Sequence, residues 1–156
     1  MITDEGVVKI MDFGLAQLQQ EGEEKLTRTG IAIGTPAYMS PEQAQGVAID
    51  HRTDIFSFGI VLYELFSGQR PFQGDNQMSV LYAIVNTEPR RIRDMNPGLP
   101  EAIEAIVTKT LKKDKAERYQ EMQDLVADLE ALRLASPARG RWSRWGGRPK
   151  IWKRSP

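Results

Sequence analysis

Few side chains of this sequence could do chemistry, and the composition narrows what that chemistry could be. There is no cysteine, which excludes disulfides and thiolate metal sites, and a single histidine, His51, which excludes a histidine-based metal cluster. The remaining candidates are carboxylates and hydroxyls. Asp12 stands in the tripeptide Asp12-Phe13-Gly14, and two threonines, Thr27 and Thr29, lie in a polar stretch. Taken alone, Asp12 is typical of a turn-capping aspartate and the threonines of an ordinary loop.

The elements that must position these residues can be predicted from the order of the chain. The apolar run of residues 7–11 follows an Asp-Glu-Gly turn signal and predicts a short strand that leads into the Asp-Phe-Gly tripeptide. Residues 17–33 are polar and mixed, which predicts a long exposed loop. Ser40, Pro41 and Gln43 have the spacing of a capping box, so a short helix is expected to begin there.

Residues 53–68 predict the helix around which the rest of the chain is organised. Thr53 is expected as its N-cap, Asp54 suits the positive end of the helix dipole, and Gly68 suits a left-handed residue after the last turn. The apolar residues occupy every side of a 3.6-residue period. A helix that is apolar all round and too short for a bilayer must be surrounded by protein, so we expect a central buried helix.

Three amphipathic segments follow the central helix, and each predicts a further helix. Their expected apolar faces are Met78, Leu81, Tyr82 and Val85 within residues 75–87; Ile103, Ile106, Val107 and Leu111 within residues 100–111; and Met122, Leu125, Val126, Leu129 and Leu132 within residues 120–134. Residues 88–100 and 112–119 are expected as connectors. The predicted fold class is therefore mainly α, with one short strand before Asp12.

The composition changes abruptly near residue 135. The segment 135–156 holds all three tryptophans, seven basic residues and no acidic residue, without a helix or strand period. We expect a structured region over 1–134 and a disordered basic tail over 135–156. The tail has three interpretations: an unstructured linker, the remnant of a truncated or shifted reading frame, or a segment that could touch nucleic acid or, weakly, an anionic membrane. The formal net charge of the whole chain is zero, so no nucleic-acid partner is expected.

Four motifs appear in an order and at a spacing that make the chain resemble a known family. They are KIMDFGLA, GTPAYMSPEQ, DHRTDIFSFGIVLYELFSG with a following Pro-Phe, and DKAERY. Together they resemble the C-terminal lobe of a eukaryotic-like serine/threonine protein kinase of the bacterial type, over residues 2–133. The resemblance implies a helical kinase C-lobe, beginning just before Asp-Phe-Gly. It also implies a protein that transfers the γ-phosphate of ATP to serine or threonine of protein substrates.

The resemblance assigns the cofactor site to Asp12, Phe13 and Gly14. Asp12 would bind the Mg²⁺ that bridges the ATP phosphates, because a hard cation prefers carboxylate oxygens. Gly14 would let the backbone turn sharply, and Phe13 would pack beneath the nucleotide. ATP and Mg²⁺ are thus the cofactors expected in the full kinase.

The resemblance also assigns regulatory and substrate-docking positions. Thr27 and Thr29 fall in the activation loop, where a phosphate can order the loop onto arginines. Thr35 would lie beside the substrate hydroxyl. The residues that would shape the pocket for the residue after the target are Pro36, Ala37, Tyr38 and Met39, called the docking segment below.

Three further residues are implied to be structural. Glu42 would form a buried ion pair with Arg118, and Asp54 would accept hydrogen bonds from the backbone of the catalytic loop. The chain departs from the family pattern at Ser40, where alanine is usual, and at Lys115, where proline is usual.

Several parts of the family pattern precede Asp-Phe-Gly and are not found in the sequence: the Gly-rich loop, the phosphate-binding lysine with its glutamate partner, and the catalytic loop with its base. We therefore expect an incomplete kinase fold without the N-lobe, inactive and poorly stable by itself. Its expected partners are the N-lobe or parent chain and protein substrates. Its expected location is the cytoplasm, or the cytosolic side as part of a membrane-anchored kinase. The alternatives are an orphan C-lobe that binds proteins without catalysis and a decayed or truncated gene product.

Overall fold

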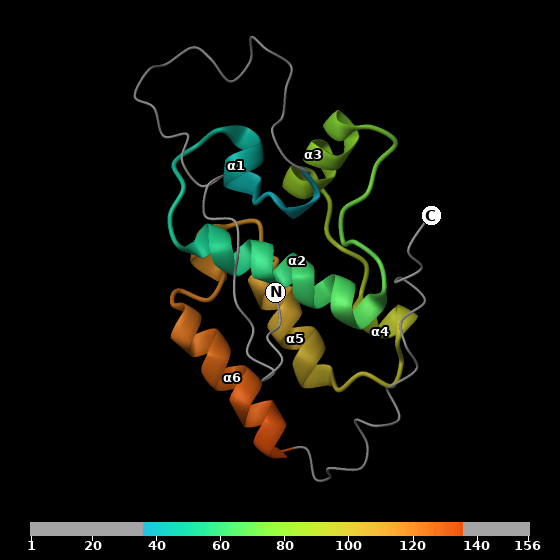
Figure 1. Cartoon of the computed structure of the whole chain (residues 1–156), viewed down its shortest axis with the longest axis vertical. Coiled ribbons are helices and arrows are strands. Elements are labelled where there is room, and N and C mark those ends of the chain that lie inside the picture. Colours follow the sequence, from blue (N-terminus) through green and yellow to red (C-terminus); the bar gives the residue numbers. More distant parts are fainter. Residues whose placement is uncertain (1–35, 136–156) are drawn as a thin grey trace, which may run out of the picture. The chain divides into compact units, whose positions relative to one another are not determined.

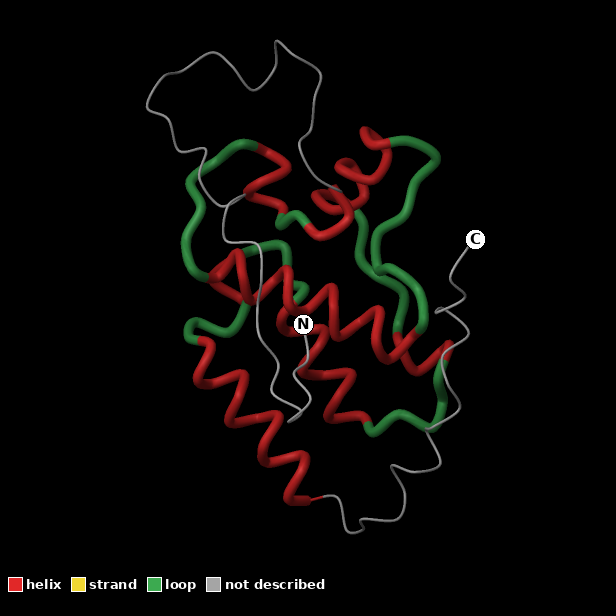
Figure 2. Tube along the Cα trace, in the orientation of Figure 1, coloured by secondary structure: helices red, strands yellow, loops and turns green. Residues whose placement is uncertain are grey.

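The computed structural model describes residues 36–135, which consist of helices and connecting loops, with no strand among them (Figure 2). The elements in chain order are η2 (Pro36–Tyr38), α1 (Pro41–Gln45), α2 (Arg52–Ser67), α3 (Gln77–Asn86), α4 (Ile92–Met95), α5 (Glu101–Thr110), η3 (Lys115–Glu117) and α6 (Met122–Ala135). The strand predicted at residues 7–11 lies outside the described residues. So do Asp12, Phe13, Gly14, Thr27, Thr29, Thr35 and the tail from residue 136.

Helix α2 occupies the middle of the described region, as the sequence predicted. In Figure 1 it runs between α1 and α3 on one side and α5 and α6 on the other. Phe56, Ile60 and Tyr63 of α2 belong to a core cluster with residues from α3 to α5, while Ile55 packs in a second cluster with Leu125 of α6. Buried apolar side chains on different sides of one helix therefore hold the neighbouring helices around it.

A glycine lets α2 and α5 approach closely. A Cβ built on Gly59 would lie 2.2 Å from Oγ1 and 2.7 Å from Cβ of Thr110. Thr110 is fully buried, and its hydroxyl donates to the Val107 carbonyl at 2.7 Å. The crossing of the two helices therefore requires the absence of a side chain at position 59.

Two of the predicted helix caps are confirmed. The Ser40 hydroxyl accepts from the Gln43 N–H while the Gln43 side chain accepts from the Ser40 N–H, which completes the capping box of α1. Gly68 ends α2 in the left-handed region with φ of 73°. The prediction of Thr53 as the N-cap of α2 is wrong. His51 is the cap residue, and Thr53 lies within the first turn, where its hydroxyl donates to Glu42.

One face of α2 is left exposed in the described part of the chain. Phe58, Val61 and Leu65 are exposed large apolar residues, and Leu65 is 70% exposed. Asp54, one turn before Phe58, is exposed as well. Spacings of three and four residues place these four side chains on one face, called the α2 outer face below.

The apolar face predicted for α3 is wrong at Met78 and Tyr82, whereas Leu81 and Val85 are partly buried. Met78 and Tyr82 are 73% and 67% exposed, whereas Ala83 and Ile84 are buried. The α3 helix begins at Gln77 behind an Asn76 cap rather than at residue 75. The buried side of α3 is therefore short, and large apolar side chains face away from the core.

None of the helices in the described part of the chain is both long and apolar enough to cross a bilayer.

Candidate functional site

The docking segment is a single turn of 3₁₀ helix, η2, followed by Met39. The Met39 N–H donates to the Pro36 carbonyl at 3.0 Å, which closes the turn. Pro36 and Ala37 are buried, while Tyr38 remains 36% exposed. The segment is thus anchored by its first two residues and presents Tyr38 at the surface.

Helix α2 holds Tyr38 at two points that lie two turns apart. The Ser57 hydroxyl donates to the Tyr38 carbonyl at 2.9 Å, and the Tyr38 hydroxyl donates to Glu64 Oε2 at 2.8 Å. The hydrogen bond to Glu64 and burial raise the pKa of Tyr38 above its ordinary value, so the phenol stays protonated. Arg70 flanks the pair, with its guanidinium 5.7 Å from the Tyr38 ring centroid.

These two contacts were not predicted from the sequence. Ser57 and Glu64 are seven residues apart on α2, a spacing that places them on one helix face. That periodicity is the only local signal they carry. Their partner Tyr38 is 19 and 26 residues away, so no local pattern indicates the contact.

Behind the docking segment, Glu42 and Arg118 form the buried ion pair that the sequence predicted. Arg118 Nη1 and Nη2 donate to Glu42 Oε1 and Oε2, each at 2.8 Å. Glu42 is 3% exposed and Arg118 is 2% exposed. The Thr53 hydroxyl adds a third hydrogen bond to Glu42, at 2.7 Å. Burial by itself raises the pKa of Glu42, but the hydrogen bonds from Arg118 and Thr53 outweigh it and lower this pKa to about 2.

The rest of the Arg118 guanidinium is also satisfied. Its Nε donates to the Lys112 carbonyl, and the second N–H groups of Nη1 and Nη2 reach the Arg52 and Lys113 carbonyls, over 2.8 to 3.1 Å. Every N–H of the side chain therefore has an acceptor, which is the condition under which a buried charge is tolerated. One arginine thus joins α1, the start of α2 and the loop after α5.

Lys115, which departs from the family pattern, makes a second connection between the same regions. Its ammonium donates to Asp50 Oδ2 at 3.1 Å and to the Ala48 carbonyl at 2.8 Å. Asp50 Oδ2 also accepts a hydrogen bond from Arg52 Nη2 at 2.8 Å. Hydrogen bonds from Arg52, and then from Lys115, hold the pKa of Asp50 well below its ordinary value. The departure at Lys115 therefore replaces a proline by an ion pair between the loop before α2 and η3.

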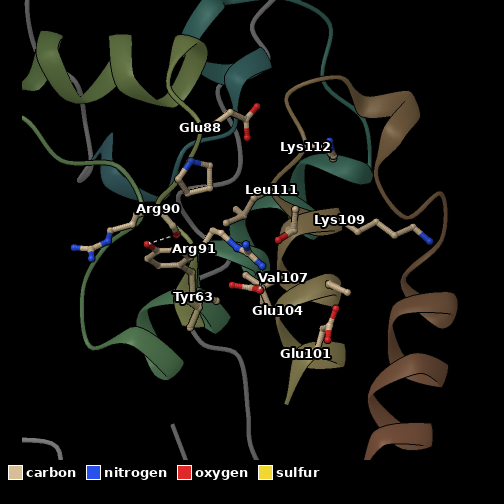
Figure 3. Close-up of a pocket in the computed structure, with 14 residues that line it drawn as sticks. Tyr63, Glu88, Arg90, Arg91, Glu101, Glu104, Val107, Lys109, Leu111 and Lys112 are labelled. Atoms are coloured by element: carbon tan, nitrogen blue, oxygen red, sulfur yellow. Dashed lines mark hydrogen bonds and ion pairs between the residues drawn. The ribbon is translucent and has the colours of Figure 1, made fainter. Parts of the chain in front are cut away.

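A cavity of about 580 Å³ lies between residues 88–92 and α5, away from the docking segment (Figure 3). The Arg91 guanidinium forms an ion pair with Glu104 at 3.0 Å, and the Tyr63 hydroxyl donates to the Arg90 carbonyl at 2.8 Å. The Arg93 N–H adds a further hydrogen bond to Glu104. These polar groups tie α4 to α5 and α2, and none of the residues predicted for the site lines this cavity.

Within residues 36–135 there is no group of three or more His, Cys, Asp or Glu side chains that could hold a metal ion. Asp12, the residue predicted to bind Mg²⁺, lies outside these residues, as do the predicted phosphorylation sites Thr27 and Thr29.

The family model of the protein kinase domain matches residues 1–128 of this sequence. The chain belongs to the protein kinase family. The predicted resemblance is thereby confirmed, and the match includes the predicted cofactor turn at Asp12, the docking segment and the Glu42–Arg118 pair.

The relatives of this kinase chain include bacterial serine/threonine kinases. It is 40% identical over 136 residues to the probable serine/threonine-protein kinase CE0033 of Corynebacterium efficiens, and 39% identical over 137 residues to the serine/threonine-protein kinase PknB of Mycobacterium tuberculosis. A probable serine/threonine-protein kinase of Streptomyces coelicolor, SCO3848, is 41% identical over 137 residues. The alignments cover 85–88% of this chain but only 20–22% of the relatives. The chain thus spans about a fifth of the length of these relatives.

Among solved structures, the twitchin kinase region of C. elegans matches this kinase chain with a TM-score of 0.56 and 25% sequence identity. The match covers 67% of this chain and 18% of that one. The helical arrangement around α2 is therefore that of a kinase C-lobe, as the sequence predicted.

Proposed function

We propose that this chain is the C-lobe part of a kinase that transfers the γ-phosphate of ATP to serine or threonine hydroxyls of proteins. The observation that carries the proposal is the anchored docking segment. Ser57 and Glu64 fix Tyr38 on α2, and the buried Glu42–Arg118 pair braces the helix that follows. A surface segment held on a rigid helix is what positioning a protein substrate requires, because small displacements of reacting groups are costly in rate.

In this proposal the residues in and before the docking segment have separate roles in substrate binding and regulation. Thr35, next to the segment, lies beside the substrate hydroxyl, and the substrate residue after the target contacts Pro36, Ala37, Tyr38 and Met39. Thr27 and Thr29 are the candidate phosphorylation sites that order the preceding loop. We propose that the kinase is located in the cytoplasm, or on the cytosolic side of the membrane as part of a membrane-anchored kinase.

The cofactor part of the proposal rests on the donor chemistry of the Asp-Phe-Gly turn. The Asp12 carboxylate is a hard oxygen ligand of the kind that Mg²⁺ prefers, so Asp12 would hold the metal with Phe13 and Gly14 at the nucleotide. When bound, Mg²⁺–ATP supplies the phosphoryl group and neutralises its charge. The catalytic base and the nucleotide cradle would come from the kinase N-lobe and catalytic loop, outside this sequence.

The exposed α2 outer face offers a surface on which the rest of the kinase would pack. Phe58, Val61 and Leu65 form an exposed apolar stripe on the central helix, and such a stripe marks a surface that another segment covers. Asp54 lies at one end of the stripe, where its carboxylate could accept backbone N–H groups of the covering segment. We propose that the remainder of the kinase is the segment that covers this face.

A second candidate function is a protein-binding module without catalysis. Met78 and Tyr82 of α3 favour it, because two large apolar side chains one turn apart are 73% and 67% exposed. Helix α3 packs against η2 of the docking segment, so this surface adjoins the one that the kinase proposal uses for substrate docking and does not by itself separate the two functions.

Nucleotide binding distinguishes the kinase from the binding module. It should be measured on the native polypeptide, which is the protein containing this chain as its own cell produces it. Calorimetric titration with ATP is expected to show binding that strengthens with Mg²⁺ and loses this dependence in Asp12→Asn. Asp75→Asn, an exposed carboxylate before α3, serves as the control and should behave as the parent. Absence of ATP binding in the parent protein would support the binding module and contradict the kinase.

A further inference from the structure

A groove runs between α5 and α6, on the side of the molecule away from the docking segment. Figure 1 shows the two helices beside each other, and Tyr119, Leu125 and Leu129 hold them together. The groove has a volume of about 450 Å³ and a mostly apolar lining. Small side chains open it on both helices: Ala102 and Ala105 on α5, and Ala131 and Ala135 on α6.

The α6 side of this groove is acidic. Asp128 lines it, Asp124 lies one turn earlier on the same helix, and Glu121 directly precedes α6; all three are exposed. Lys109 is the cation of the lining, and its ammonium lies 3.9 Å from the Tyr119 ring centroid. The groove therefore combines an apolar floor with an edge of negative charge, which suits an occupant that is both aromatic and basic.

We propose that residues 139–145 of the same chain bind the α5–α6 groove. This segment, RGRWSRW, contains two tryptophans and three arginines and no acidic residue. An indole would fill the space that the alanines leave, and a guanidinium would pair with Asp124 or Asp128. The proposal is independent of catalysis, because it uses no residue of the docking segment or of the cofactor turn.

Chain length permits this contact. Ala135 both ends α6 and lines the groove, and Trp142 is seven residues further along the chain. Seven extended residues reach about 23 Å, while α6 itself is about 21 Å long, so Trp142 can return along the whole helix.

Charge favours the same contact. Seven of the 21 basic residues and none of the 21 acidic residues lie in 136–156, so the remaining chain carries a formal charge of −7 against +7 in the tail. Attraction between the two is strongest at low salt and weakens as salt is added.

The test is zero-length cross-linking of the native polypeptide with a carbodiimide, which joins an amine to a carboxylate. Lys150 and Lys153 follow the proposed segment, and we expect mass spectrometry to find them joined to Glu121, Asp124 or Asp128. Ala131→Arg places a bulky cation in the groove and should reduce these products several-fold. Ala131 is exposed, so the variant should still fold. Val126→Arg, on an exposed side of α6 that does not line the groove, should leave the products unchanged.

Three outcomes would overturn the proposal. One is the absence of tail-to-α6 products, or their equal yield in both variants. Another is a product that joins an isotope-labelled copy to an unlabelled one in a mixture, since the tail would then occupy a second molecule. The last is the loss of these products when anionic vesicles are added to the parent protein, which would show that the tail prefers the membrane to the groove.

Discussion

Arg118 is the residue on which the described region depends most at the scale of single side chains. Its guanidinium makes two hydrogen bonds to Glu42 and three to backbone carbonyls, and nearly all of it is buried. Removing one partner of such a pair leaves the other charge buried without compensation. The contribution of Arg118 is therefore best seen as the cost of stranding Glu42.

Arg118→Ala is expected to lower the free energy of unfolding of the native polypeptide by about 3–5 kcal/mol, because Glu42 would remain buried without its partner. Chemical denaturation followed by circular dichroism measures this change. Arg133→Ala, an exposed arginine on α6, is the control and should change stability by no more than about 0.5 kcal/mol. A loss below about 1 kcal/mol for Arg118→Ala would contradict the role assigned to the pair.

The lowered pKa of Glu42 predicts a pH dependence with a definite sign. The carboxylate is favoured in the folded state, with a pKa of about 2 instead of 4.5, so its contribution is complete above about pH 5 and disappears as the pH falls to about 2. The stability difference between the parent and Glu42→Gln should therefore shrink over this range. Unfolding free energies of both proteins from pH 7 to pH 2 measure it, and a constant difference would disprove the assignment.

At the scale of elements, the sequence predicted well what depends on neighbours in the chain. The capping box at Ser40 and the left-handed Gly68 were found as expected, because caps involve residues within four positions. The Glu42–Arg118 pair was predicted only through the family resemblance, since its partners are 76 residues apart.

The elements that were predicted wrongly are those decided by distant contacts. Thr53 is a residue type that is common at N-caps, but its hydroxyl donates a hydrogen bond to the buried Glu42 instead. The face of α3 with Met78 and Tyr82 has the period of a core face, yet the structure leaves both residues exposed. Periodicity indicates that a helix has an apolar side and does not indicate which protein that side contacts.

The crossing of α2 and α5 predicts a severe effect at Gly59. Gly59→Ala would place a methyl group against the buried Thr110, and such overpacking costs about 1–3 kcal/mol. Thermal unfolding of the native polypeptide measures it. Gly98→Ala is the matched control, because its nearest neighbour, Asn96 Oδ1, lies 3.8 Å from the added Cβ; it should be neutral. Equal effects of the two substitutions would contradict the close approach of the helices.

At the scale of the whole molecule, we propose that the rest of a kinase packs on the α2 outer face of this chain. A central helix with one exposed apolar stripe has a surface for a further segment of protein. The relatives of this chain are about four times its length, which is consistent with a larger protein around the same helix.

Leu65 tests this interpretation in the native polypeptide. Leu65→Ser should lower the free energy of unfolding by about 1.5–3 kcal/mol if the side chain is covered there. Leu134→Ser is the control, because Leu134 is 80% exposed on α6 and should tolerate serine. Denaturant titration of both variants distinguishes the cases, and equally small effects would show that the α2 outer face is not covered.

Phosphate transfer by the native polypeptide is the most direct measurement of whether this chain is part of a serine/threonine kinase. The protein would be incubated with Mg²⁺ and γ-labelled ATP, and with peptide libraries that present serine and threonine or tyrosine alone. We expect label on serine and threonine but not on tyrosine, and loss of this label in Asp12→Asn. Absence of transfer by the native polypeptide, or equal transfer by the Asp12→Asn variant, would contradict the kinase proposal.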